Sequence, residues 1–330
     1  MAEFLTFDTD LTAVANAIRA KGGTSAQLIY PSGFVSAIQA IQTGITPKLV
    51  VTTTPGAAIT ATPAEGFKVV KGTAGADGMC TLELPKAGTW HVTAMANSVS
   101  NSQNIVIGTQ NMLLPLYHDT FADNTWEEII AVCRTGIAPD SWAVGDSKTM
   151  NIGGTAYQVD IIGKNHDEYA DGSGTAPLTF QLHDCYSEAK QMYSTNLSGL
   201  GWKNTDMRLT YLPAILALMP AEVQNGIRAV NKKTSEGGNS TTIETVSDTL
   251  FLLSEVEIFG TASSSVAGEG SQYDYYKAGN PKIKKREGVD EFWWERSSAS
   301  GGMFCRVRAN GQAGASNASS SLGVSFAFCF

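Results

Sequence analysis

The sequence predicts a multidomain α+β protein, and three observations lead to this prediction. Apolar residues recur at helical spacing in residues 1–46, and short β-rich runs separated by turn signals fill residues 47–110. Residues 111–330 mix both kinds of segment. Because 330 residues suffice for two or three domains, we expect a separate unit in each of these three ranges.

Residues 1–46 predict two short helices. In the first, Leu11, Val14 and Ile18 recur at helical spacing after a cap at Thr9 or Asp10, and the segment FVSAIQAIQTG repeats the pattern. Helices of this length are marginal alone. They therefore need a partner, either the next domain or copies of the same chain.

Residues 47–110 predict a small β-sandwich. Runs such as KLVVTTT, CTLELP and TWHVTAMA are short, rich in β-branched residues and separated by Pro-Gly, Asp-Gly and Ala-Gly turns. Leu82 and Leu84 alternate with Thr81 and Glu83. This alternation predicts strands with one buried face and one face in water.

Residues 111–330 predict a larger α+β domain. NTWEEIIAVCRTG is a helix with a capping box from Asn124 to Glu127, and LPAILALMPAEVQNGIRAV is helical with Pro213 and Pro220 in first turns. AYQVDIIG and LTFQLH are strands, and DTLFLLSEVEIFG is partly extended. Asn310-Gly311 predicts a hairpin, and the apolar run VSFAFCF predicts a central strand.

Composition and charge exclude some functions. The net charge of -8 gives no electrostatic footprint for nucleic acid, and no apolar run approaches the ~20 residues of a membrane span. The N-terminal MAEFLTFDTDL has no apolar signal-peptide core, so export is not expected. With export not indicated, the five scattered cysteines are expected to be reduced and buried.

Motifs for catalysis are missing, so we expect no enzyme, no cofactor and no metal. The sequence has no GxxxxGK[ST], HExxH, GxSxG or CxxC. The polar segment 165–174, NHDEYADGSG, fits no EF-hand spacing and is interpreted as a turn rather than a cation site. Cys305 and Cys329 are expected on neighbouring strands, as a soft-metal pair, a disulfide or, the favoured alternative, two buried hydrophobes. Trp293 and Trp294 could stack on a sugar, but a strand turns one of them inward.

The C-terminal motifs FWWERSS, FCRV, NG, NAS and GVSFAFC resemble the signature of an uncharacterised family of phage tail and prophage proteins. The resemblance covers about residues 124–330 and includes WAVGDSKTMNIGGTAYQVDIIG and LFLLSEVEIFG. That family resembles the C-type lectin fold, in the branch shared with formylglycine-generating enzymes and the variable proteins of diversity-generating retroelements. Residues 1–46 resemble tail-protein leader segments, and residues 47–110 resemble the immunoglobulin-like or carboxypeptidase-regulatory-like modules of such proteins.

The resemblance implies a fixed frame with exchangeable side chains between its members. The implied structural frame includes Trp293, Trp294, Arg296, Cys305, Gly311, Gly323 and Phe328. The implied variable, ligand-binding positions are Ala299, Ser300, Gly302, Met303, Arg306, Arg308, Ala309, Ala313, Gly314, Ala315, Ser316, Asn317, Ser321 and Leu322. Such a division is typical of binding surfaces whose specificity changes while the fold is kept.

The expected function is therefore a phage or prophage tail-tip receptor-binding protein, located in the virion and made in the bacterial cytoplasm. Its expected partners are a host cell-surface protein or glycan, other tail proteins, and two further copies of itself in a homotrimer, without nucleic acid or membrane insertion. One alternative is a formylglycine-generating-type oxidase using Cys305 and Cys329 as a copper pair. The other is a bacterial surface adhesin, which would need a signal peptide or anchor.

Overall fold

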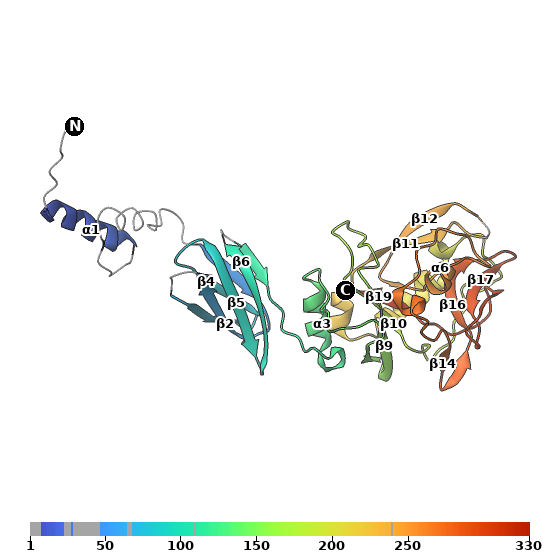
Figure 1. The fold of residues 1–330 in the computed structure, drawn as a ribbon. Coiled ribbons are helices and arrows are strands. Elements are labelled where there is room, and N and C mark those ends of the chain that lie inside the picture. The colour runs from blue at the N-terminus through green and yellow to red at the C-terminus, as the bar shows by residue number, and fades with distance from the viewer. Residues whose placement is uncertain (1–7, 23–27, 29–46, 65–67, 108–109, 239) are drawn as a thin grey trace. The chain divides into compact units, whose positions relative to one another are not determined.

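The computed structural model describes residues 8–22, 28, 47–64, 68–107, 110–238 and 240–330. The chain divides into two units, Met1–Leu116 and Tyr117–Phe330. Figure 1 shows strands and short helices in both, so the α+β multidomain prediction is confirmed at that level. No helix in the described ranges is long and apolar enough to cross a lipid bilayer.

The first described element is helix α1, Asp8–Gly22. It begins before the predicted caps, because Asp8, Thr9 and Asp10 already lie within it. Ala15 and Ile18 are buried and Leu11 packs against them, whereas Val14 is 47% exposed. The buried face therefore follows positions 11, 15 and 18, and the prediction for Val14 was wrong. The second predicted helix lies outside the described residues.

Two sheets with one common core make up the rest of the first unit (Figure 1). One sheet has the order β4-β1-β7, with β4 Met79–Glu83, β1 Lys48–Thr52 and β7 Gln110–Leu113. The other has the order β3-β2-β5-β6, with β3 Val70–Thr73, β2 Ala58–Pro63, β5 Gly88–Ala96 and β6 Val99–Ile107. Leu49 and Val51 of one sheet and Ile59 and Trp90 of the other are buried in this core.

The first unit extends beyond residue 110, where the sequence predicted its end. Strand β7 pairs in parallel with β1, with Leu49 opposite Gln110 and Thr52 opposite Leu113. The backbone N–H of Leu114 then donates to the carbonyl of Thr52 at 2.9 Å. These bonds join residues 110–114 to the β-sheet unit.

A five-stranded sheet is the centre of the second unit. Its order is β13-β19-β10-β9-β8, with β13 Leu250–Phe251, β19 Ala327–Cys329, β10 Leu178–Leu182, β9 Thr155–Lys164 and β8 Ser147–Ile152. The smaller sheets are β11 Val230–Ser235 with β12 Ile243–Asp248, β14 Lys284–Arg286 with β15 Val289–Glu291, and β16 Trp293–Ser298 with β17 Met303–Val307 and β18 Ala313–Asn317.

Short helices connect these strands. They are η1 Phe121–Asp123, α3 Trp126–Cys133, η2 Trp202–Asn204, the π-helix η3 Met207–Tyr211, α4 Leu212–Leu216, α5 Ala221–Gly226, α6 Glu255–Phe259 and α7 Asp274–Lys277. The long helical segment predicted around Pro213 and Pro220 is thus two helices: Pro213 lies in the first turn of α4, but Pro220 is the extended N-cap of α5.

The capping box of α3 lies one residue later than predicted. Thr125 is the N-cap and Glu128 completes the box. Asn124, the predicted cap, is buried and serves the preceding loop instead: its side chain accepts from the N–H of His118 at 2.7 Å and donates to the carbonyl of Thr120 at 2.9 Å. Asn124 and Thr125 can both cap a helix, and Thr125 is the cap because the Asn124 side chain is bound to the preceding loop.

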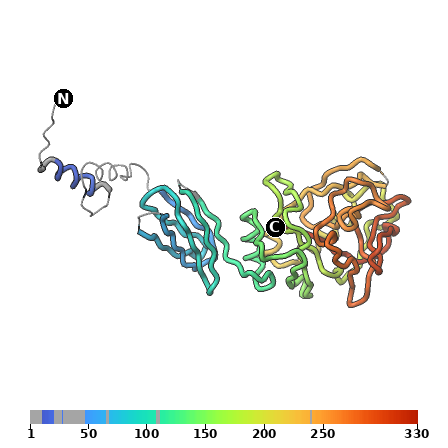
Figure 2. Tube along the Cα trace, in the orientation of Figure 1, coloured from blue at the N-terminus to red at the C-terminus, as the bar shows by residue number. Residues whose placement is uncertain are grey.

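The C-terminal strand lies inside its sheet, as predicted. β19 pairs with β10 on one side and β13 on the other, and residues 324–330 are all buried. The ring of Phe180 lies 5.3 Å from those of both Phe328 and Phe330, and Trp126 of α3 lies 6.0 Å from Phe330. The chain end therefore packs beside α3 at the centre of the core (Figure 2).

Candidate functional site

The predicted binding region is the hairpin of β17 and β18. The Arg308 N–H donates to the Gln312 carbonyl at 2.7 Å, and the Gly311 N–H donates to the Arg308 carbonyl at 2.8 Å. Gly311 has φ +81°, which a residue with a side chain rarely adopts. The hairpin predicted from Asn310-Gly311 is confirmed, and β18 is the edge strand of the sheet β16-β17-β18.

Strand β16 pairs with β17 on the side away from the edge strand β18. All of its residues are buried, and its pairing with β17 shifts register between Trp294 and Ser298. The indole N–H of Trp293 donates to the Lys282 carbonyl at 2.9 Å, and that of Trp294 donates to the Lys190 carbonyl at 2.8 Å. Both indoles are fully buried, so neither is a stacking platform for a sugar.

Arg296 of β16 is fully buried at the end of a chain of charges. Its guanidinium donates to both carboxylate oxygens of Glu257 and, at 2.9 Å, to the carbonyl of Lys233. The ammonium of Lys232 lies 2.7 Å from Glu257 Oε1 and 2.6 Å from Asp167 Oδ1. The order Asp167, Lys232, Glu257, Arg296 alternates sign, so these four charges, named here the buried charge network, sum to zero.

The two acids of the buried charge network stay ionised. Burial alone raises the pKa of the Asp167 carboxyl, but the charges of Lys232 and His166 and the hydrogen bonds from Lys232 and Thr179 together outweigh it, and the pKa is lowered. Burial likewise opposes ionisation of Glu257, and the charges of Arg296 and Lys232 lower its pKa. Removing either cation would leave a buried carboxylate without its counter-ion.

The polar segment 165–174 is a loop between β9 and β10, as predicted. Asp167 points into the buried charge network and also accepts from the hydroxyls of Thr179 and Tyr273. The exposed Asp171 accepts from its own loop at the Ser173 N–H and pairs with Arg228 at 2.6 Å. These acids have structural partners, and the described residues contain no group of three or more His, Cys, Asp or Glu side chains arranged to hold a metal ion.

Most of the predicted ligand-binding positions reach solvent. Exposed or partly exposed are Ser300, Gly302, Met303, Arg306, Arg308, Ala309, Ala313, Ala315, Ser316, Asn317, Ser321 and Leu322. Of the predicted frame residues, Gly311 is partly exposed, and the others are buried: Trp293, Trp294, Arg296, Cys305, Gly323 and Phe328. A Cβ at Gly323 would lie 2.6 Å from the Cys185 sulfur, so this frame position requires glycine.

Three predicted variable positions belong to the scaffold instead. Ala299 is buried, and its carbonyl accepts from the Ser198 hydroxyl at 2.8 Å. Gly302 has φ +76°, and a Cβ there would lie 2.5 Å from the Asn196 carbonyl oxygen. Gly314 is buried beneath the side chain of Arg308. The contacts of Ala299 and Gly302 come from segments about a hundred residues away in sequence, which the sequence pattern does not indicate.

Three acids, Glu255, Glu269 and Glu295, lie near Cys305 of β17, and the sequence did not indicate this group. Glu295 is fully buried, and neither of its carboxylate oxygens has a hydrogen-bond partner in the described part of the chain. Burial, then the nearby Glu255 and Glu269, raise the pKa of Glu295 well above its ordinary value. Burial therefore favours the neutral form of the Glu295 carboxyl.

Glu255 differs from Glu295, because its carboxylate is ionised and hydrogen-bonded. Its carboxylate accepts from the backbone N–H groups of Ser263 and Ser265 at 3.0 and 2.9 Å and from both of their hydroxyls. Burial opposes ionisation of Glu255, but these bonds lower its pKa. The thiol of Cys305 on β17 donates to Glu255 Oε2, with the sulfur 3.9 Å from that oxygen.

Cys305 and Cys329 do not lie on neighbouring strands. Cys305 is on β17, which pairs with β16 and β18, whereas Cys329 is on β19 in the five-stranded sheet. All five cysteines are free and buried, so the disulfide alternative is wrong. Burial and neighbouring carboxylates raise the pKa values of both thiols, which opposes the thiolate that a soft metal needs.

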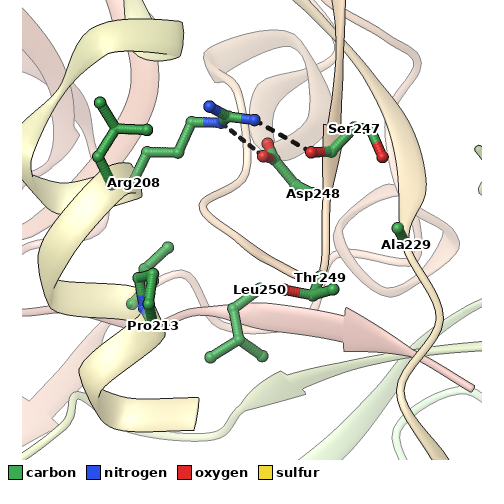
Figure 3. A pocket seen from close by; sticks show the side chains of 9 residues that line it. Arg208, Pro213, Ala229, Ser247, Asp248, Thr249 and Leu250 are labelled. Atoms are coloured by element: carbon green, nitrogen blue, oxygen red, sulfur yellow. Dashed lines mark hydrogen bonds and ion pairs between the residues drawn. The ribbon is translucent and has the colours of Figure 1, made fainter.

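Two open cavities lie elsewhere on the second unit. One, of about 310 Å³, has Arg208 and Asp248 at its rim and Leu212, Pro213 and Leu250 among its apolar lining. Figure 3 shows Arg208 pointing at Asp248, with Nε 2.6 Å from Oδ1. The other, of about 420 Å³, is lined by residues of 119–122, 141 and 146–147. Since Arg208 and Asp248 bind one another, their charges compensate each other within the first cavity.

One family model matches part of the chain. Residues 179–330 are similar to a family described as a domain of unknown function, DUF6273. The match starts at β10 and includes Lys232, Glu257 and Arg296, but it leaves out Asp167. Comparison with curated proteins and with solved structures finds no match.

We expect Lys232→Met to destabilise the second unit by about 3–5 kcal/mol, because it leaves two buried carboxylates with less compensation. Lys203→Met is the control: Lys203 is half exposed and pairs with Glu244 at 3.0 Å, so about 0–1 kcal/mol is expected. Urea unfolding of both variants measures the difference. Equal losses would contradict a structural role for the buried charge network.

We expect Glu295→Gln to become progressively more stabilising, relative to the native chain, as pH rises above the ordinary glutamate pKa of 4.5. The folded chain keeps a proton on Glu295 that the unfolded chain releases, so native stability falls with pH by at most about 1.4 kcal/mol per unit. Urea unfolding at pH 5 to 8 measures this, with the exposed Glu188→Gln as control. Parallel stability curves for Glu295→Gln and the native chain would refute the buried neutral acid.

Proposed function

We propose that this chain is a phage or prophage tail-tip receptor-binding protein whose C-terminal domain, of C-type-lectin-like fold, binds a host cell-surface protein or glycan. The observation that carries the proposal is the division within residues 293–328. Large residues such as Trp293 and Phe328 are buried, and small polar ones such as Ser300, Asn317 and Ser321 are exposed. Exposed small side chains contribute little to stability, so they are free to serve binding.

The other parts of the chain fit this proposal as attachment and spacing units. The two-sheet unit is an immunoglobulin-like spacer, and residues 1–46 attach the protein to other tail proteins and join three copies in a homotrimer. The protein is then a component of the virion. In this proposal, retroelement-driven diversification changes the exposed positions. Ser300 and Ser321 tolerate such changes because both are exposed.

The oxidase alternative lacks support at its site. A copper pair needs two thiolates that converge on one ion. Cys305 and Cys329 lie in different sheets, and both thiols have raised pKa values. Non-catalytic binding is the function that the arrangement favours.

The test is a comparison of surface and scaffold variants of the full chain. Ser300→Tyr, Asn317→Tyr and Ser321→Tyr together should leave the melting temperature within a few degrees, because exposed substitutions typically change stability by about ±0.5 kcal/mol each. The same variant should lose or redirect binding to whole bacterial cells, measured by flow cytometry of labelled protein on a strain panel.

Phe328→Ala is the contrasting variant, and it should cost about 3–5 kcal/mol through a core cavity. The proposal fails if the native protein binds no strain, or if the triple tyrosine variant keeps the native binding pattern. It also fails if that variant unfolds the domain as Phe328→Ala does.

A further inference from the structure

Two arginines stand together near the turn of the hairpin: Arg306 is in β17, and Arg308 lies one residue beyond the end of β17. They are two positions apart, and the Arg308 N–H continues the pairing with residue 312, so both side chains leave the hairpin on the same side. Arg306 is directly opposite Gly314 of β18, and a Cβ on Gly314 would lie 2.8 Å from Arg308 Nε. The side chain of Arg308 therefore occupies the space that a side chain at position 314 would take, next to Arg306 on the neighbouring strand.

Neither arginine has a carboxylate partner among the described residues. Four other arginines of the second unit, Arg208, Arg228, Arg286 and Arg296, each pair with an acid. Arg134 also has no ion pair among the described residues, so the closeness of the two arginines sets them apart: burial and then the charge of Arg308 lower the pKa of Arg306. Their mutual repulsion is relieved when an anion binds between them.

The guanidinium of Arg306 is held in place before any ligand arrives. Its plane lies over the ring of Phe292, with the guanidinium carbon 4.2 Å from the ring centroid. Its Nε donates to the Ala315 carbonyl at 3.3 Å. Arg308 is exposed and remains free to close on a ligand. A fixed donor beside an adaptable one suits the recognition of a planar or tetrahedral anion.

The surroundings favour a polyhydroxylated ligand over a protein. The predicted binding set offers the hydroxyl and amide groups of Ser300, Ser316 and Asn317, and Met303 and Leu322 are its only large apolar side chains. Protein interfaces draw most of their affinity from buried aromatic anchors, and the predicted binding set contains no aromatic residue. Hydroxyl, amide and guanidinium groups bind sugars, and the predicted binding set contains all three.

We propose that Arg306 and Arg308 bind the carboxylate or phosphate of an acidic glycan on the host cell surface. The proposal rests on the receptor-binding function above and names its ligand class. Gly314 is the positioning residue, since its missing side chain lets the two guanidinium groups approach one anion.

The direct test is the NMR signal of the arginine Nε–H groups in the full chain. Glucuronate tests a carboxylate, glucose 6-phosphate tests a phosphate, and glucose is the neutral control. At least one of the two acids should shift the Arg306 and Arg308 signals, with a dissociation constant on the order of 1 mM, while glucose shifts neither. Arg134 is exposed and distant in sequence, and its signal should stay unchanged.

The matched variants are Arg308→Gln, Gly314→Val and the control Arg134→Gln. Loss of one charge-assisted contact should weaken acid binding about tenfold or more in the first two variants, and the control should bind as the native chain does. The inference is overturned if neither acid shifts the pair, if Arg134 responds equally, or if Arg308→Gln keeps native affinity.

Cell binding separates failure of this inference from failure of the proposed function. The double variant Arg306→Gln, Arg308→Gln should lose binding to the strains that the native chain binds. If it keeps that binding while the triple tyrosine variant loses it, the surface recognises its host without an anion site and this inference is wrong. If both variants keep native binding, the proposed function itself fails.

Discussion

The buried charge network of Asp167, Lys232, Glu257 and Arg296 is the interaction on which the second unit depends. It joins the loop after β9 to β11, α6 and β16, four segments that are far apart in sequence. Each charge has its compensation only when the other segments are in place, because buried ions without partners are costly. The network therefore couples the formation of the five-stranded core to the placing of β16, and through β16 to the hairpin that bears the predicted binding surface.

The hairpin has inner positions that accept few side chains and outer positions that accept many. Glu295 behind it is buried with a raised pKa, and Gly302 allows close approach of the Asn196 backbone, so a charge at position 295 or a side chain at position 302 is costly. Ser300, Asn317 and Ser321 on the outside have no comparable duty. A scaffold that is fixed from within can present different outer side chains without refolding, which is the physical basis of the proposed recognition function.

Local patterns in the sequence predicted local structure well. Asn310-Gly311 specified its hairpin through turn chemistry, and the unbroken apolar run VSFAFCF indicated an inner strand. Contacts between distant segments were not predictable. Lys232 and Glu257 are ordinary charged residues in the sequence, and nothing local places them together in the interior. For the same reason the sheet of Cys305, the burial of Ala299 and the required glycine at position 302 emerged only from the structure.

The central claim is that the buried charge network, and not the exposed side chains, maintains the fold of the second unit. Two libraries of the full chain, sorted for protease resistance, test it most directly. One randomises Ser300, Asn317 and Ser321, and the other randomises Lys232 and Glu257. The account predicts that most members of the first library stay resistant and that most of the second are cleaved. Comparable resistance in the two libraries would contradict it.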